Sequence, residues 1–255
     1  MRSALIGYTG FVGSNVLRQR SFDDLYNSKN IETIAGRAYD LIICAGAPAE
    51  KWKANQNPEA DRAAIDKLTN ALAGVKARQF MLISTVDVYP TPIDVDEDSV
   101  PDGTKGSAYG RHRRLLEAFV VARFPTLVAR LPGLFGTGLK KNIIYDFLHG
   151  NQVDKVHADA RFQFYGLHRL WDDLQKAQYA RLAVWNAATE PVSVAEVARD
   201  GFGMNFQNRP AGTTPARYDM HTRYAALWGK SGRYLQDKKS VLEEIRQFVK
   251  EEKGL

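Results

Sequence analysis

Three glycines follow one another at intervals of three residues near the start of the chain, at Gly7, Gly10 and Gly13. They come directly after the apolar run Ala4–Ile6 and before a segment with helical periodicity. In such a turn, glycines let the backbone approach a pyrophosphate, and the first N–H groups of the helix hold its charge. The spacing in this context predicts a dinucleotide-binding turn rather than an ordinary one. The expected cofactor contacts are Gly7, Thr9, Gly10, Phe11, Val12 and Gly13.

A second set of reactive side chains lies in two later segments. Thr85 stands at the end of an apolar run, and Tyr109 begins a helical segment that carries Arg113 one turn further on. Residues at i and i+4 lie on one face of a helix, so Arg113 can place a positive charge beside Tyr109. A phenol with a pKa of about 10 is a poor base at neutral pH unless a cation stabilises the phenolate. The spacing suits proton transfer at a substrate oxygen; an aromatic packed at a helix start and a plain strand-end hydroxyl are the alternatives.

A sheet and its helices must bring these residues together. Short apolar runs alternate with helical periodicity through the first half of the chain, which predicts a parallel sheet covered by helices. Only one short strand, near Phe22–Tyr26, and one helical turn, near Ile31–Ile34, fit between the first helix and Tyr39, so the sheet is expected to be abbreviated at that edge. The other expected strands are Ala4–Ile6, Tyr39–Cys44, Phe80–Ser84 and Thr126–Leu131, and further helices are expected from Pro58 and over Ala108–Phe119.

The alternation of strands and helices loosens after residue 135. This change predicts a core over residues 1–135 and a smaller lobe over 136–255 that is not an independent domain. Two serine–glutamate pairs in the lobe have the spacing of capping boxes at helix starts. They are Ser193 with Glu196 and Ser240 with Glu243; helices are expected over Lys141–His149 and Val192–Arg199, and a strand over Leu182–Asn186.

The order of these segments resembles the extended short-chain dehydrogenase/reductases, which include nucleotide-sugar epimerases, dehydratases and reductases. The resemblance rests on GYTGFVG at 7–13, a strand ending in Ala-Gly-Ala at 45–47, STVDVYP at 84–90, AYGRHR at 108–113, RLPGLFG at 130–136 and LAVWNAATEPVSVAEV at 182–197. It implies an α/β fold with a doubly wound parallel Rossmann sheet and a smaller C-terminal α/β lobe. It also implies an NAD or NADP cofactor and a sugar or nucleotide-sugar substrate, and it is compatible with a homodimer.

The resemblance assigns roles to individual positions. Tyr109 matches the general acid/base of the family, Thr85 matches its catalytic hydroxyl, and Arg113 stands where the family has the lysine of YxxxK. Further cofactor contacts are expected at Ala45, Gly46, Ala47, Ser84 and Pro132, and substrate contacts at Asp87, Lys140, Lys141 and Asn142.

Two positions depart from the family pattern. Arg113 keeps the positive charge of the lysine but cannot lose a proton, and Ile65 stands where an asparagine commonly supports the proton relay. The chain is therefore either an NAD(P)-dependent oxidoreductase or epimerase, or a dinucleotide-binding sensor or regulator without dehydrogenase chemistry. Arg113 itself has two interpretations. It is either a simple fixed charge that lysine could replace, or a fork held by a carboxylate that lysine could not match.

The choice between NAD and NADP depends on the end of the second strand. An acid there binds the ribose 2′-hydroxyl of NAD and repels the 2′-phosphate of NADP. One alignment places Asn27 and Ser28 there, followed by Lys29, which favours NADP. The alternative places Asp23 or Asp24 at that end, which favours NAD.

Composition limits the remaining classes of partner. The 255 residues include 35 Lys and Arg against 29 Asp and Glu, so the net charge is +6, and no basic block stands apart. No nucleic-acid partner is expected from this balance. The single cysteine, Cys44, excludes an internal disulfide and is expected in the core, and no Cys/His cluster predicts a metal. Neither a signal peptide nor a stretch of about 18 apolar residues is found, so a cytoplasmic location and no membrane partner are expected.

Overall fold

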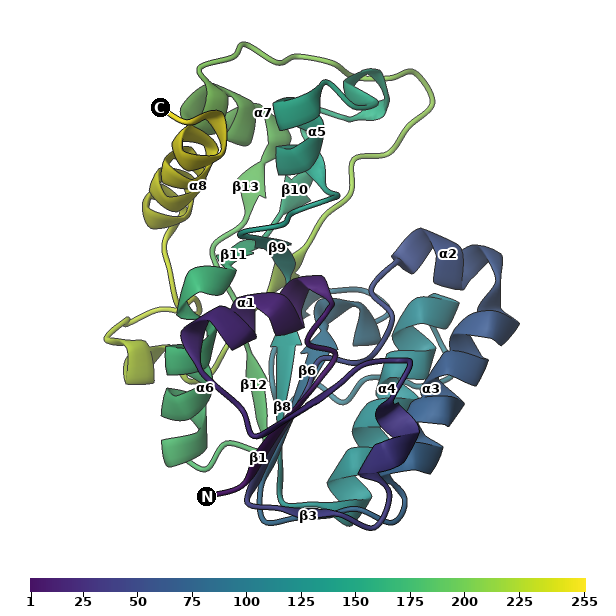
Figure 1. Ribbon diagram of the computed structural model, residues 1–255. Helices are drawn as coiled ribbons and strands as arrows, with labels where there is room; N and C mark the ends of the chain where they lie inside the picture. Colours follow the sequence, from purple (N-terminus) through teal and green to yellow (C-terminus); the bar gives the residue numbers. More distant parts are fainter. The chain divides into compact units, whose positions relative to one another are not determined.

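The computed structural model describes residues 1–255, which form two compact units that each draw on separate stretches of the chain (Figure 1). Each unit contains secondary structure from early and late parts of the sequence. The first unit comprises Met1–Thr91, Ser99–Arg130 and His168–Trp185, and the second comprises Pro92–Asp98, Leu131–Leu167 and Asn186–Leu255.

The first unit is built on a six-stranded sheet with the order β12-β8-β6-β4-β1-β2. β1 pairs in parallel with β2 on one side and with β4 on the other, and β4 pairs in parallel with β6. The sheet therefore grows in two directions from β1, which confirms the predicted doubly wound Rossmann-type α/β fold. The strands are β1 (Ser3–Ile6), β2 (Asp24–Tyr26), β4 (Leu41–Cys44), β6 (Phe80–Thr85), β8 (Thr126–Leu131) and β12 (Val184–Asn186).

Helices cover this sheet, with α3 packed against α4 and α1 in contact with α6 (Figure 1). Alternate residues of the central strands, such as Ala4, Ile42 and Phe80, share one core with Leu68 and Leu116 of α3 and α4. That alternation is what a pleated strand dictates, because successive side chains point to opposite faces. The helical elements are α1 (Phe11–Gln19), η1 (Ile31–Ile34), α2 (Lys51–Gln56), α3 (Pro58–Leu72), η2 (Val86–Val88), α4 (Ala108–Arg123), η4 (Leu167–Arg169) and α6 (Leu170–Tyr179).

The abbreviated edge of the sheet is confirmed, with one correction. β2 has three residues and is followed only by the turn η1. The expected strand Tyr39–Cys44 is broken at Asp40, whose N–H donates to the carbonyl of Arg2 while its carboxylate accepts from the N–H of Arg2. The part before the break, β3 (Ala38–Tyr39), pairs instead with β5 (Lys76–Ala77) in a small sheet of its own. Cys44 lies in the core as predicted, and burial raises the pKa of its thiol to about 11.

The second unit packs short strands and helices around the last helix. Its core includes Phe135, Ile144, Val197, Ile245 and Phe248. Three two-stranded sheets pair β10 with β13, β9 with β11 and β7 with β14. No helix anywhere in the chain combines the length and the apolar character that a membrane crossing requires. The elements are β7 (Ile93–Val95), β9 (Gly133–Phe135), α5 (Ile143–His149), η3 (Val153–Lys155), β10 (Arg161–Phe162), β11 (Phe164–Gly166), β13 (Val192–Ser193), α7 (Val194–Glu196), the π-helical turn η5 (Val197–Gly201), β14 (Asp219–Met220), η6 (Ala225–Trp228) and α8 (Lys238–Lys253).

Of the two expected capping boxes, one is confirmed and one is wrong. Ser193 and Glu196 make both reciprocal hydrogen bonds at the start of α7. The helix begins at Val194 rather than Val192, because β13 pairs with β10 just before it. At the last helix the cap is Asp237, whose carboxylate accepts from the N–H and the hydroxyl of Ser240.

Candidate active site on the first unit

The glycine turn between β1 and α1 closes too tightly for any side chain at two of its positions. Gly7 has φ +86°, and a Cβ there would lie 2.3 Å from the carbonyl oxygen of Ala45. A Cβ on Gly13 would lie 2.1 Å from the carbonyl oxygen of Gly7. Gly10 begins α1 without any side chain capping the helix. The first N–H groups of α1 are therefore not taken by a side-chain cap, as an anion-binding turn requires.

The end of the neighbouring strand β4 contacts the same turn. The N–H of Ala45 donates to the carbonyl of Ile6 at 2.8 Å. A Cβ on Gly46 would lie 2.8 Å from Cγ2 of Ile6. Ala45, Gly46 and Ala47 are half-buried and sit at the point where the order of strands reverses, which is where ligands bind in open α/β sheets.

The end of β2 carries an amide and not an acid. Asn27 follows the last residue of the strand, and its Nδ2 lies 3.3 Å from the phenol oxygen of Tyr8. Asp23 and Asp24 lie at the opposite end of the strand, where Asp23 accepts from Ser3 and Asp24 pairs with two arginines. Neither aspartate therefore lies at the carboxyl end of β2, where the alternative placed one.

Thr85 and Tyr109 meet where β6 ends and α4 begins. The Thr85 Oγ1 accepts the N–H of Asp87 at 3.2 Å, and the hydroxyl is hydrogen-bonded to the Tyr109 phenol. Because its oxygen already accepts a hydrogen bond, the Thr85 hydroxyl can direct its proton to the phenol oxygen. Gly110 makes this approach possible, since a Cβ there would lie 1.9 Å from the carbonyl oxygen of Asp87.

Arg113 lies under the ring of Tyr109, and its fork is fully used by the protein. Its Cζ is 3.9 Å from the ring centroid. Nη1 and Nη2 donate to the two carboxylate oxygens of Asp61 at 2.5 and 2.8 Å. Nη1 also donates to the carbonyl of Tyr109 at 3.2 Å, and Nη2 donates to the carbonyl of Pro48. All four terminal N–H bonds thus have acceptors within the chain, and the buried Nε has none.

The partner of Arg113 was missed by the sequence analysis. Asp61 is buried on α3, and its Oδ2 also lies 2.7 Å from Nδ1 of His112. Burial alone would raise the pKa of Asp61, but the hydrogen bonds from Arg113 and His112 outweigh it and hold that pKa below the usual value. One signal was available, because Asp61 lies one helical turn before Ile65 on the buried face of its helix.

A second missed residue, Lys51, supplies another charge to the site. Its ammonium on α2 lies 2.7 Å from Oδ1 of Asp87. The pKa of Tyr109 is raised above that of a free phenol, chiefly by burial and further by the charge of Asp87. The charges of Arg113 and Lys51 and the hydrogen bond to Thr85 act in the opposite direction. The protonated phenol is therefore the resting form.

The expected cofactor residue Ser84 lies in the interior, and so does Ile65, which stands where the family commonly has an asparagine. Ser84 is buried, and its hydroxyl donates to Glu117 at 2.6 Å, within a network in which Glu117 also pairs with Arg130. Its side chain is therefore committed inside the protein and not to a cofactor. Ile65 is 1% exposed and packs in the apolar core, so it offers no group to a proton relay.

The second unit holds the other expected residues. Pro132 is buried between β8 and β9, and Lys140 and Lys141 are exposed ahead of α5. The helix begins at Ile143 and not at Lys141, because Asn142 caps it with φ +99°. The amide of Asn142 accepts the N–H groups of Ile144 and Tyr145 and donates to Leu134, so it holds the helix start in place.

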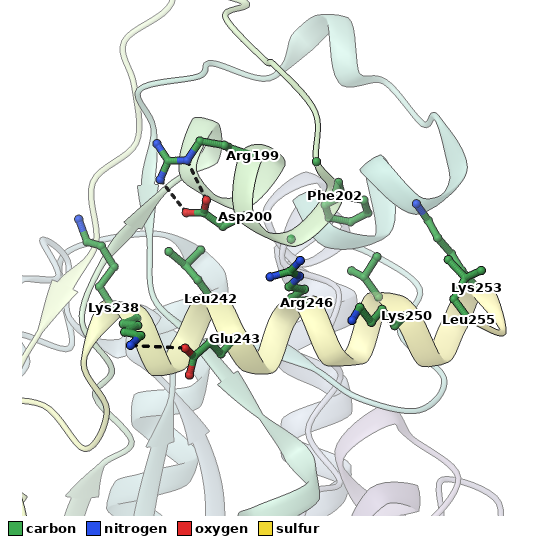
Figure 2. A pocket seen from close by; sticks show the side chains of 14 residues that line it. Arg199, Asp200, Phe202, Lys238, Leu242, Glu243, Arg246, Lys250, Lys253 and Leu255 are labelled. Carbon is green, nitrogen blue, oxygen red and sulfur yellow. Dashed lines mark hydrogen bonds and ion pairs between the residues drawn. The ribbon is translucent and has the colours of Figure 1, made fainter.

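A cationic groove of about 880 Å³ lies between η5 and α8 in the second unit (Figure 2). Three of its cations make ion pairs, Arg199 with Asp200, Lys238 with Glu196 and Lys239 with Glu243. Arg246 carries no ion-pair partner. The lining includes Arg199, Lys238, Lys239, Arg246, Lys250 and Lys253 as cations and Asp200 and Glu243 as anions.

The second unit also brings Asp94, Asp219 and His221 together, with one ligand-type atom of each within 4.8 Å of the others. Asp219 accepts from the Tyr234 phenol at 2.6 Å and lies 3.2 Å from Nε2 of His221. Asp94 lies farther away, with its Oδ1 4.0 Å from Nε2 of His221. The three side chains come from β7 and the region of β14, which are far apart in the sequence, and no cluster in the sequence indicated them.

Solved structures share the fold of the whole chain. The dTDP-4-dehydrorhamnose reductase of Clostridium acetobutylicum is 16% identical, with 99% of this chain and 100% of that chain covered and a TM-score of 0.72. TunA, an NAD-dependent NDP-hexosamine 5,6-dehydratase of tunicamycin biosynthesis, is 16% identical, with 100% and 98% covered and a TM-score of 0.74. A UDP-glucose 4-epimerase of Thermotoga maritima, solved with UDP-glucose, is 16% identical, with 100% and 99% covered and a TM-score of 0.69.

These likenesses confirm the fold that the resemblance to the extended short-chain dehydrogenase/reductases implied. No protein-family model matches the sequence, and no curated protein is significantly similar to it.

Proposed function

We propose that the protein binds a nicotinamide dinucleotide along the carboxyl edge of the first unit's sheet and uses Tyr109 to transfer a proton at a sugar oxygen. The observation that carries this proposal is the hydrogen-bonded pair of Thr85 and Tyr109 with the guanidinium of Arg113 against the ring. Thr85 ends β6, which lies two strands from β1 and the glycine turn that follows it. Neighbouring strands are about 4.8 Å apart, so one extended dinucleotide spans both.

The residues present fit such a cofactor. Gly7 and Gly13 shape a turn that no side chain fills, and the uncapped start of α1 offers N–H groups to a pyrophosphate. When bound, the cofactor supplies or accepts the hydride at the substrate carbon. Tyr109 then donates its proton to the oxygen of a carbonyl that is being reduced, or its phenolate accepts the proton of a hydroxyl that is being oxidised. With substrate bound, the Thr85 hydroxyl would donate its one proton to that same oxygen instead of to the Tyr109 phenol.

The resting protonation of Tyr109 favours the reducing direction. Burial keeps its pKa above the ordinary value, so the phenol holds its proton at neutral pH and is ready to donate it. Arg113 keeps a cation against the ring for the moment when the phenolate forms. A carbonyl reductase is therefore the reaction class that this site serves best.

Nucleotide-sugars are the substrate class to test first. Proteins of this fold include a dTDP-4-dehydrorhamnose reductase and an epimerase solved with UDP-glucose. In this chain, Asp87 lies two residues after Thr85 and would face the sugar. The substrate contacts expected at Lys140 and Lys141 stay a prediction from the sequence.

NADP is the cofactor that the end of β2 favours. Asn27 and Ser28 bring no negative charge to the ribose position, and Lys29 adds a positive one. Lys67 also reaches this turn, with its ammonium 3.2 Å from the carbonyl oxygen of Ser28 and 3.0 Å from Oε1 of Glu32. A 2′-phosphate would be attracted to this turn and not repelled.

Titration with NADPH and NADH, followed by turnover with a panel of keto-sugar nucleotides, tests the proposal. We expect binding of both dinucleotides, tighter binding of NADPH, and oxidation of the bound cofactor by at least one substrate. The Tyr109→Phe variant should bind the cofactor as well as the parent protein and lose about 10²–10⁴-fold in turnover. Unchanged turnover in Tyr109→Phe, or no binding of either dinucleotide, would overturn the proposal.

A dinucleotide sensor without turnover is the second candidate. It is favoured by the use of every terminal N–H of Arg113 within the protein, which leaves none for ribose hydroxyls, and by the burial of Ile65 in the core. Tight cofactor binding without turnover on any substrate of the panel would identify this function instead.

A further inference from the structure

The cation at position 113 is fixed, both in place and in protonation. Its fork is held by Asp61 on α3 and by two backbone carbonyls, and a guanidinium does not lose its proton in a protein. Arg113 therefore supplies a constant charge to Tyr109. Any adjustment of the phenol's proton affinity must come from another charged group near the ring.

The charged groups around Tyr109 come from four elements. Arg113 and His112 are on α4 itself, Asp61 is on α3, Asp87 is on η2, and Lys51 is on α2. Asp61 joins the first two into one buried cluster. The remaining two, Asp87 and Lys51, form a separate ion pair, with 42% of the lysine side chain exposed against 17% of the aspartate side chain.

The position of this ion pair beside Tyr109 is set by the backbone. The N–H of Asp87 is bound to the Thr85 hydroxyl, which in turn is bound to the Tyr109 phenol. The carbonyl of Asp87 presses on Gly110, the residue after Tyr109. Tyr109 is held from α2 as well, since its N–H donates to the side-chain oxygen of Asn55 at 3.2 Å, one turn after Lys51. The carboxylate and the ammonium thus approach Tyr109 from two anchored elements.

We propose that Lys51 and Asp87 act together as positioning residues that set the proton affinity of Tyr109, so that the adjustable cation of this site comes from α2 and not from position 113. Lys51 favours the phenolate and Asp87 favours the phenol, because opposite charges nearby stabilise a charged form and like charges disfavour it. The proposal deepens the proposed function and rests on it. It gives Asp87 a role through Tyr109, in addition to any contact with substrate.

Opposite shifts in a pH profile test this assignment. The carbonyl reduction should decline as pH rises through the pKa of Tyr109, because the protonated phenol is the donor. Lys51→Met removes the cation and leaves Asp87, so this decline should move about one unit to higher pH. Asp87→Asn removes the anion and leaves Lys51, so the decline should move to lower pH. The double variant should lie between the two single variants.

Controls separate this effect from damage to the fold. Lys53→Met is the matched control, because Lys53 lies two residues away on α2, is exposed, and contacts Glu50 and the Trp52 ring and not Asp87. It should leave the profile unchanged. Lys51→Arg keeps the charge and should keep the profile close to that of the parent protein, even if the rate changes.

A readout without turnover keeps the test independent of the substrate. In protein labelled with ¹³C in the tyrosine rings, the signal missing from Tyr109→Phe identifies Tyr109, and its titration can be followed in each variant. If the parent protein neither binds nor oxidises NAD(P)H, the proposed function is refuted. The NMR titration of Tyr109 would still test whether Lys51 and Asp87 set its pKa. Shifts of the same sign in Lys51→Met and Asp87→Asn, or no shift in Lys51→Met, would refute the assignment.

Discussion

Replacing Arg113 by lysine keeps a positive charge under Tyr109 but removes the planar fork that the protein uses. The guanidinium makes two hydrogen bonds to Asp61 and one each to the carbonyls of Tyr109 and Pro48. An ammonium can keep one bond to the carboxylate, yet it cannot reproduce the parallel pair and reach both carbonyls. The swap therefore loses at least two bonds in a buried site.

The loss of folding stability in Arg113→Lys depends on which interactions of the side chain lysine keeps. Removing one partner of a buried ion pair altogether destabilises by about 3–5 kcal/mol. Lysine retains the charge, so the loss should be smaller, at about 2 kcal/mol, or roughly two bonds at about 1 kcal/mol each. For a chain of this size that corresponds to a fall in the melting temperature of about 4–8 °C. The first turn of α4 should loosen with it, and the affinity for the dinucleotide should fall.

Urea unfolding and cofactor titration of Arg113→Lys measure both effects. Arg114→Lys is the matched control on the same helix, because Arg114 is partly exposed and makes a single contact of 3.4 Å with Glu117. It should change the free energy of unfolding by less than about 0.5 kcal/mol. An Arg113→Lys protein as stable as the parent, with equal or higher turnover, would show that position 113 needs only a charge.

Three further outcomes follow from the geometry. Gly13→Ala should weaken dinucleotide binding at least tenfold and lower the melting temperature, because its Cβ would lie 2.1 Å from the Gly7 carbonyl; Gly74→Ala, whose Cβ would meet nothing closer than 3.6 Å, should do neither. Asp61 has a lowered folded pKa, so its stabilising effect is fully present above the unfolded pKa of about 4 and is lost as pH falls through the folded value. Urea unfolding across that acid range should show a shallower fall in Asp61→Asn than in the parent, and equal slopes would contradict the role of Asp61. Ser193→Ala should destabilise by about 1 kcal/mol through loss of the capping box, and Ser240→Ala by less, since Asp237 caps α8; denaturation curves showing the reverse order would refute this.

The parts of the site that could be predicted from the sequence are those that depend on short patterns of neighbouring residues. The glycine turn could be predicted because three glycines after an apolar strand leave few other conformations for residues 7–13. Thr85 and Tyr109 could be paired because Thr85 ends a strand and Tyr109 starts a helix. Both segments occur in the order of motifs that the family shows. The abbreviated sheet edge could be predicted because too few residues separate α1 from Tyr39.

The charges that complete the site could not be predicted, since they come from contacts between distant elements. Lys51 lies in α2, a short and mostly exposed helix with no apolar periodicity to reveal it. Asp61 lies on a helix whose apolar face was predicted. Its partners, Arg113 and His112, could not be predicted, because they are on α4 and meet Asp61 only when α3 packs against α4. Ser84 was expected among the cofactor contacts, and no pattern in the sequence identifies a buried partner for its hydroxyl. In the structure, Glu117 binds Ser84 from the buried side of α4.

The division of the chain into interleaved units affects how it must be synthesised. The residues that return to the first unit, His168–Trp185, carry α6 and most of β12, the last strand on one side of the six-stranded sheet. Until residues 168–185 leave the ribosome, β8 is an unpaired edge strand. The N–H of Val128, for example, lacks the carbonyl of Ala183 to which it donates in the folded protein. Such an edge pairs readily with other chains. The nascent protein therefore carries an unfinished sheet through the synthesis of residues 131–186, and a polypeptide ending near residue 135 should aggregate instead of folding as a Rossmann unit.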